Sequence, residues 1–77
     1  MIQVRILTNT GAKAGNLEGT QTVADAIRAL GASTANCMIQ ANGQTFSALQ
    51  AEDTTLESVQ QDNKVTIATI VKLEGAR

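Results

Sequence analysis

The chain has 77 residues, six basic and seven acidic side chains, a formal charge of −1 and no histidine. This length allows one domain, whose core is too small to enclose a deep cleft, and a hydrophobic content of 43% is typical of a globular chain rather than a disordered one. The near-neutral charge and the single aromatic residue, Phe46, exclude the basic stripe and the stacking platform of a nucleic-acid binder.

Cysteine content and hydropathy predict the setting of the protein. Cys37 is the single cysteine, so no intramolecular disulfide is possible, and a reducing, cytoplasmic environment is expected. No segment has the pattern of a signal peptide. No apolar run approaches the roughly 20 residues that span a bilayer. We therefore expect a cytoplasmic domain that contacts neither membrane nor nucleic acid.

The first predicted element is a strand over residues 2–6, in which apolar and polar side chains alternate. Residues 8–15 are rich in turn formers and predict a hairpin loop. The Gly-x-x-x-Gly pattern around Lys13 in this loop lacks the Lys-Ser/Thr ending of a phosphate-binding loop. A short second strand is expected over residues 16–21.

A helix is predicted over residues 23–30. Thr22 and Asp25 have the spacing of a capping box, with Asp in place of the usual Glu. Apolar residues then recur at i, i+4 and i+7 on one helical face. Gly31 can adopt the left-handed conformation that commonly ends a helix.

The second half of the chain predicts a hairpin, a capped turn and a last strand. Asn42-Gly43 between two strand-like runs is the strongest short-range signal of a type I′ hairpin turn. Thr54 and Glu57 have capping-box spacing at the start of the turn. A second turn at residues 62–63 leads into a long strand over residues 64–73.

These elements predict an α+β fold with a single domain over residues 1–73 and a flexible tail over residues 74–77. The first and last strands are the most apolar, so we expect them to lie side by side in the middle of the sheet. The sheet is predicted to be mixed and four- to five-stranded, with one helix packed across one face.

The element order resembles the β-grasp of ubiquitin, and still more that of the small sulfur-carrier proteins of thiamine and molybdopterin synthesis. Residues 1–6, 22–27, 41–44 and 61–67 carry the resemblance. It implies a ubiquitin-like β-grasp fold. It also implies a C-terminal Gly-Gly whose carboxylate is adenylated by an activating enzyme and then thiolated or conjugated.

The C-terminus departs from this family pattern. The chain ends with a single glycine, Gly75, followed by Ala76 and Arg77. A glycine pair lets a carrier tail enter a narrow active site, because neither residue has a Cβ. A carrier or modifier function would therefore require removal of Ala76 and Arg77 and reaction at Gly75.

Catalytic and metal-binding residues are not expected. Without histidine, neither a Ser-His nor a Cys-His pair can form. Cys37 has the strand parity of Ile39 and is predicted to face the core as a small hydrophobe instead of acting as a reactive thiol. The adjacent acids Glu52 and Asp53 are expected to be solvated in a loop, and no calcium-loop spacing occurs. The sequence predicts neither enzyme activity, nor a metal site, nor a cofactor.

Strand alternation predicts a patch on the sheet face opposite the helix. Its expected members are Leu7, Met38, Gln40, Ala68, Ile70 and Lys72. Contiguous apolar patches mark partner-binding surfaces, whereas scattered apolar residues are normal on any protein surface. We expect a non-enzymatic, ubiquitin-like module that binds another protein through this face. Two alternatives stay open: a sulfur carrier or modifier activated at Gly75, and a structural subunit of a virion or larger assembly.

Overall fold

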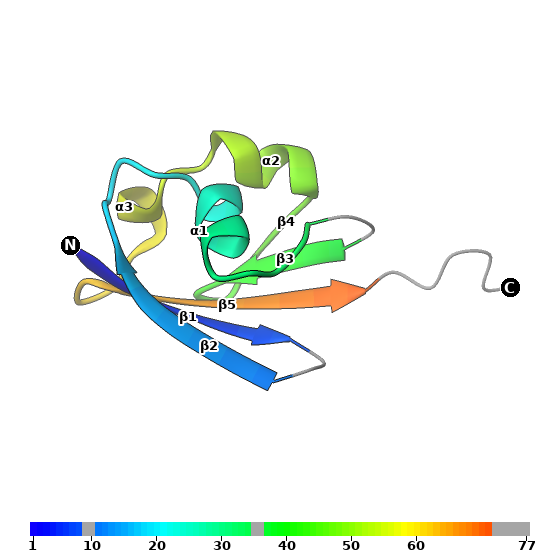
Figure 1. The fold of residues 1–77 in the computed structure, drawn as a ribbon. Helices are drawn as coiled ribbons and strands as arrows, with labels where there is room; N and C mark the ends of the chain where they lie inside the picture. The colour runs from blue at the N-terminus through cyan, green and yellow to red at the C-terminus, as the bar shows by residue number, and fades with distance from the viewer. Residues whose placement is uncertain (9–10, 35–36, 72–77) are drawn as a thin grey trace, which may run out of the picture.

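A five-stranded mixed sheet forms one layer of the molecule and three helices cover one face of it (Figure 1). This computed structural model describes residues 1–8, 11–34 and 37–71. The elements are β1 (Ile2–Thr8), β2 (Gly11–Leu17), α1 (Val23–Ala29), β3 (Cys37–Ala41), β4 (Gln44–Phe46), α2 (Ala48–Asp53), α3 (Leu56–Val59) and β5 (Lys64–Val71). The predicted α+β class and mixed sheet are confirmed.

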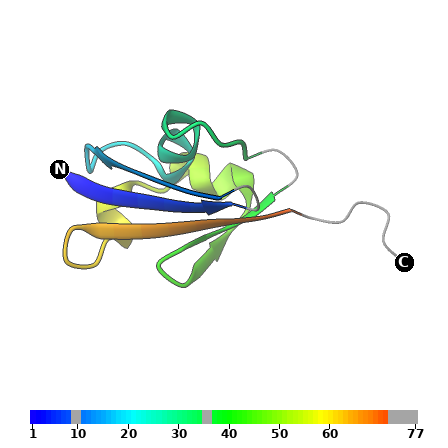
Figure 2. The same cartoon turned by 60° about the horizontal axis from the view of Figure 1, so that its bottom comes forward.

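The strand order is β2-β1-β5-β3-β4. β1 and β5 pair in parallel along the middle of the sheet (Figure 2), and every other neighbouring pair is antiparallel. The expectation that the first and last strands lie side by side is therefore confirmed. Because β5 separates the β1–β2 hairpin from the β3–β4 hairpin, it joins the two halves of the sheet.

The core lies between the sheet and the helices. Alternate residues of β1 are buried, as the period-2 pattern predicts, while Gln3 and Arg5 between them are exposed. Helix α1 buries one face against the sheet, and Leu56 and Val59 of α3 close the core near one end. The fully buried large side chains are Val4, Ile6, Val23, Ile27, Ile39, Leu56, Val65 and Ile67.

Helix α1 begins at the capping box that the sequence predicts. The Thr22 hydroxyl accepts from the backbone N–H of Asp25 at 3.0 Å, and the Asp25 carboxylate accepts from the backbone N–H of Thr22 at 3.2 Å. Two N–H groups that the helix itself leaves without partners are thus satisfied.

The end of α1 is also where the sequence predicts it. Gly31 has a φ of 84°, the left-handed conformation that favours glycine. The N–H of Gly31 donates to the carbonyl of Arg28 and the N–H of Ala32 donates to that of Ile27. This pair of bonds is a Schellman motif, which satisfies the last carbonyls of the helix.

Both predicted two-residue turns are confirmed. Asn42 and Gly43 have φ angles of 50° and 87° between β3 and β4. Asp62 and Asn63 have φ angles of 54° and 60° before β5. Positive φ at both central positions is the mark of a type I′ turn, whose twist suits paired strands.

The predicted loop over residues 8–15 is wrong. β1 continues to Thr8, and β2 already begins at Gly11. β2 ends at Leu17, whereas the second strand was predicted over residues 16–21. All seven β2 residues pair with β1, without a bulge. Glycine, alanine and lysine are poor strand formers, so this strand depends on pairing with β1 and not on its own propensity. The Lys13 pattern therefore lies in a strand and forms no phosphate loop.

Helix α2 is absent from the sequence prediction. Ser47 caps it: its hydroxyl accepts from the N–H of Gln50 at 3.1 Å, and the Gln50 side chain accepts from the N–H of Ser47 at 2.9 Å. The predicted loop position of Glu52 and Asp53 is therefore wrong, since both lie in α2.

The capping box predicted at residues 54 and 57 is also wrong. Helix α3 has Thr55 as its N-cap, without a side-chain cap bond. The Thr54 hydroxyl donates instead to the carbonyl of Gln50, at the end of α2. The Gln50 carbonyl therefore binds the Thr54 hydroxyl, which the sequence pattern had assigned to capping the next helix.

Candidate functional site

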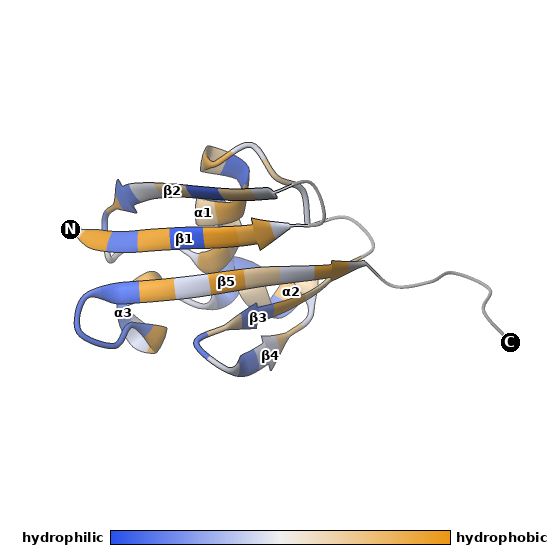
Figure 3. Ribbon diagram, turned by 90° about the horizontal axis from the view of Figure 1, so that it is seen from below, coloured by the Kyte–Doolittle hydropathy of each residue, from blue (hydrophilic) through white to orange (hydrophobic). Residues whose placement is uncertain are grey.

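The candidate site is the outer face of the sheet, which we define as the face turned away from the helices (Figure 3). The strand register places Ala68 of β5 between Leu7 of β1 and Gln40 of β3. Met38 lies beside Ile70 in the same way. The structure thus brings five of the six predicted patch residues together across three neighbouring strands. The sixth, Lys72, lies outside the described residues.

These five residues differ in exposure. Leu7 is 41% exposed and Ile70 is 48% exposed, both high values for large apolar side chains. Gln40 is exposed, whereas Met38 and Ala68 are half-buried. The cost of leaving such apolar surface in water is relieved when a partner covers it.

One neighbour of this group was not predicted from the sequence. Ala12 of β2 pairs with Leu7 and is exposed, so the apolar surface extends one strand further. No periodicity signal marks Ala12, because it falls in the segment predicted to be a loop. We call Leu7, Ala12, Met38, Ala68 and Ile70 the apolar patch.

The other end of the outer face is polar and positively charged. Arg5 lies between Ala14 and Thr66, and Gln3 lies between Asn16 and Lys64. Arg5 and Lys64 are exposed, and neither forms an ion pair with a described residue. The outer face therefore combines an apolar end with two cations that are not neutralised within the described part of the chain.

Acidic residues are segregated to the rest of the molecule. No described strand contains an Asp or a Glu. The acids of the described residues lie in helices, turns and connections: Glu18, Asp25, Glu52, Asp53, Glu57 and Asp62. Because the net charge is −1 while the outer face is positive, the charge distribution is strongly asymmetric.

The helical layer carries the described ion pairs. Arg28 of α1 contacts Glu52 of α2 at 2.9 Å and Asp25 at 2.9 Å. The hydrogen bonds from Arg28 lower the pKa of Glu52, and the backbone N–H of Thr22 followed by Arg28 lowers the pKa of Asp25. All three charged groups are exposed. This network joins α2 to α1 on the solvent side of the helical layer.

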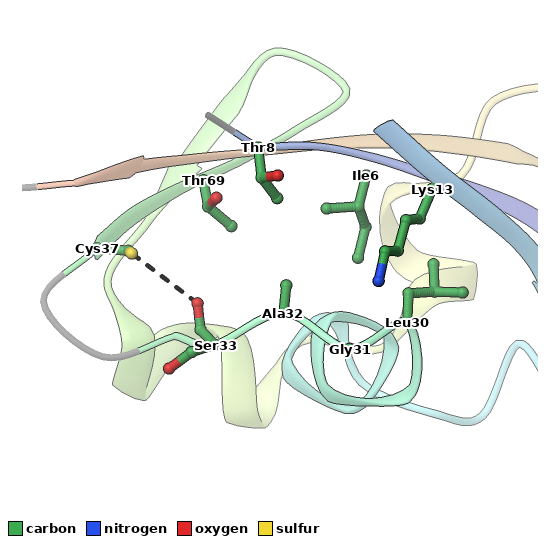
Figure 4. Close-up of a pocket in the computed structure, with 9 residues that line it drawn as sticks. All are labelled: Ile6, Thr8, Lys13, Leu30, Gly31, Ala32, Ser33, Cys37 and Thr69. Carbon is green, nitrogen blue, oxygen red and sulfur yellow. Dashed lines mark hydrogen bonds between the residues drawn. The ribbon is translucent and has the colours of Figure 1, made fainter. Parts of the chain in front are cut away.

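A pocket of about 210 Å³ opens on the inner side of the sheet, beside the end of α1 (Figure 4). It is the second candidate site. Ile6 and Leu30 supply apolar walls, and Thr69 lies at one side. The full lining is Ile6, Thr8, Lys13, Leu30, Gly31, Ala32, Ser33, Cys37 and Thr69.

Cys37 and Lys13 also line this pocket. Cys37 is half-buried and its thiol donates to the Ser33 carbonyl at 3.8 Å, so it lies on the inner side of the sheet as predicted, at the edge of the core. Lys13 projects from β2 toward Leu30 and Gly31 (Figure 4). A cation is favourable there, because the last turn of a helix is its negative end.

The described residues contain no cluster of three or more His, Cys, Asp or Glu side chains arranged to hold a metal. None of the helices within the described ranges is long and apolar enough to cross a membrane. Gly75, the residue on which the carrier alternative depends, lies outside the described residues together with Ala76 and Arg77. The carrier alternative therefore stays a prediction.

Comparison with models of protein families and with curated proteins finds no match to this chain.

Proposed function

We propose that the chain is a non-enzymatic, ubiquitin-like module that binds another protein through the outer face of its sheet. The strand order, with a parallel β1–β5 pair and α1 packed on the inner side, supports a β-grasp assignment. The observation that carries the functional proposal is the outer face itself. It carries the apolar patch at one end and Arg5 and Lys64 toward the other, and it contains no acidic residue among those described.

This combination defines the chemistry of the partner. Its binding segment should carry apolar side chains that cover Leu7 and Ile70, and carboxylates that reach Arg5 and Lys64. Burial of the apolar part supplies most of the affinity. Charge complementarity mainly raises the association rate and disfavours basic partners.

The test uses a library of random peptides, selected for binding to the full chain. Two bait proteins accompany the wild type: a Leu7→Ser/Ile70→Ser double variant and a Leu49→Ser control. Leu49 is 76% exposed but lies on α2, in the helical layer. We expect peptides rich in apolar and acidic residues to bind the wild type and the control and to lose at least about tenfold in affinity for the double variant.

Backbone amide NMR shifts then locate the contact. An enriched peptide should perturb the amides of β1, β3 and β5 most strongly. Equal affinity of the double variant, or shifts confined to the helical layer, would show that the outer face is not the docking surface. An Arg5→Glu variant should bind the same peptides more slowly, and most clearly at low ionic strength.

A further inference from the structure

The side chain of Asn42 joins the β3–β4 turn to the end of α3 and to β5. Its Nδ2 donates to the backbone carbonyls of Val59 at 2.7 Å and Lys64 at 3.0 Å. Its Oδ1 accepts from the backbone N–H of Thr66 at 2.9 Å. Both amide protons and the amide oxygen are therefore satisfied, and every partner is a backbone group.

This network extends the sheet by one position. The backbone N–H of Asn42 donates to the carbonyl of Thr66 at 3.0 Å, next to the last paired residues of β3 and β5, Ala41 and Ile67. The chain then turns away into Gly43. The Asn42 side-chain oxygen supplies the acceptor for the Thr66 N–H that a continuing strand would have supplied.

The same dipeptide is chemically labile. In deamidation the backbone nitrogen of Gly43 loses its proton to a solvent base and forms a bond to Cγ of Asn42, and the Cγ–Nδ2 bond breaks as ammonia leaves. Water then opens the cyclic imide at either carbonyl, which leaves aspartate or isoaspartate at position 42. No electrons are transferred. Glycine in the second position makes attack easiest, because it has no side chain to hinder its nitrogen.

The folded state opposes this attack. The Asn42 amide must rotate to bring Cγ toward the Gly43 nitrogen, and rotation breaks all three side-chain hydrogen bonds at once. Rotation thus requires the bonds from the Asn42 side chain to Val59 and to β5 to open together, which is a local opening of the kind that proteins undergo without unfolding completely.

The product cannot restore the network. A carboxylate at position 42 would place an oxygen against the carbonyls of Val59 and Lys64, where Asn42 now donates two protons. The two carbonyl oxygens and the carboxylate oxygen are all acceptors, and without a proton between them their contact is destabilising. An isoaspartate would in addition lengthen the backbone within a turn whose two residues both have positive φ.

We propose that Asn42–Gly43 is a modification site at the β3–β4 turn. It deamidates only when the hydrogen bonds of the Asn42 side chain open, and the modified chain cannot form them again. Loss of the Asn42 hydrogen bonds also affects the outer face, because β3, which ends at this turn, carries Met38 and Gln40. The modification itself does not depend on the docking function.

The first experiment compares deamidation of the wild-type chain in native buffer and in denaturing urea at the same mildly alkaline pH. Peptide mass spectrometry detects the gain in mass when the amide at position 42 becomes a carboxylate, and chromatographic separation of the peptides distinguishes the isomeric aspartate and isoaspartate products. We expect urea to accelerate conversion of Asn42 on the order of tenfold or more, because it removes the protection of the network. Equal rates in the two buffers would overturn the proposal.

Two variants sharpen the test. Ile39→Val removes a methyl group from a buried β3 residue that pairs with Phe46, so it should accelerate conversion in native buffer but leave the rate in urea unchanged. Asn42→Asp mimics one product and should unfold at clearly lower urea than the wild type or fail to fold. An Asn42→Asp chain as stable as the wild type would contradict the claim that the product cannot close the network.

Discussion

Arg28 and Glu52 join α1 to α2 through two hydrogen bonds, from Nη1 to Oε2 at 2.9 Å and from Nη2 to Oε1 at 3.1 Å. The same Nη2 also donates to Asp25 at 2.9 Å. One guanidinium therefore connects the first turn of α1 with the second helix. Such a bidentate geometry holds two elements in a defined orientation.

This geometry predicts a pH dependence of stability. The pKa values of Glu52 and Asp25 are lowered in the folded state, from ordinary values of 4.5 and 3.8. The unfolded chain therefore binds more protons than the folded chain in acid, and stability falls as the pH drops through and below this range. We expect Glu52→Gln to be less stable than the wild type at about pH 7 and the difference to shrink at about pH 3.

Urea denaturation at the two pH values measures this effect. Asp53→Asn serves as the control, because it removes a neighbouring charge of α2 that forms no ion pair with a described residue. A Glu52→Gln deficit that is equally large in acid would mean that packing, and not the ion pair, is responsible.

Thr22 and Thr55 provide a matched pair of helix N-caps. Thr22 accepts a side-chain hydrogen bond from the first turn of α1, whereas Thr55 makes no side-chain cap bond to α3. Thr22→Ala should therefore cost about 1 kcal/mol of unfolding free energy. Thr55→Ala should stay within about 0.5 kcal/mol of the wild type. Chemical denaturation compares the two, and equal losses would show that the capping box contributes nothing specific.

Gly31 ends α1 with a φ of 84°, so its replacement should be costly for a backbone reason. We expect Gly31→Ala to destabilise the chain by about 1–2 kcal/mol, the cost of a left-handed conformation for a residue with a Cβ. Steric crowding is secondary, since the added Cβ would meet only the flexible end of Lys13 at 3.2 Å. Gly31→Asn should cost less than Gly31→Ala in the same thermal or urea assay, because Asn tolerates this conformation. A larger loss of stability for Gly31→Asn than for Gly31→Ala would indicate that steric crowding, and not the positive φ, determines the cost of replacing Gly31.

Ile67 and Ile70 test the two faces of one strand. Ile67 is fully buried and Ile70 is 48% exposed on the outer face. Ile67→Ala should cost about 2–5 kcal/mol because it leaves a cavity in the core. Ile70→Ala should change stability by no more than about 0.5 kcal/mol, while it weakens binding of any outer-face partner. A large stability loss at Ile70 would assign that side chain to packing and not to recognition.

Local signals made much of the fold predictable. The capping box at Thr22, the helix-ending Gly31 and the Asn42-Gly43 turn each depend on a few adjacent residues, so a pattern is sufficient to identify them. Strand parity was sufficient to place Leu7 and Ile70 on one face, because the side-chain period of a strand is two.

Elements that depend on distant partners were not predictable in this way. β2 has the sequence of a loop and becomes a strand because β1 offers a full-length edge. Ala12 joins the apolar patch for the same reason. Helix α2 did have a local signal, the Ser47 and Gln50 capping box, but the short run of residues behind it has only Ala51 buried. Without an apolar stripe, the cap alone did not distinguish a helix from a loop.

The central position of β5 has a consequence for how the chain is made. β5, the strand that joins the two hairpins, leaves the ribosome after the other four strands, and its pairing with β1 connects residues that are far apart in sequence, such as Gln3 and Lys64. An isolated two-stranded hairpin is only marginally stable in water. Neither hairpin therefore has a lasting partner during synthesis, and the nascent chain should acquire its native sheet in a single late step, once β5 has left the exit tunnel.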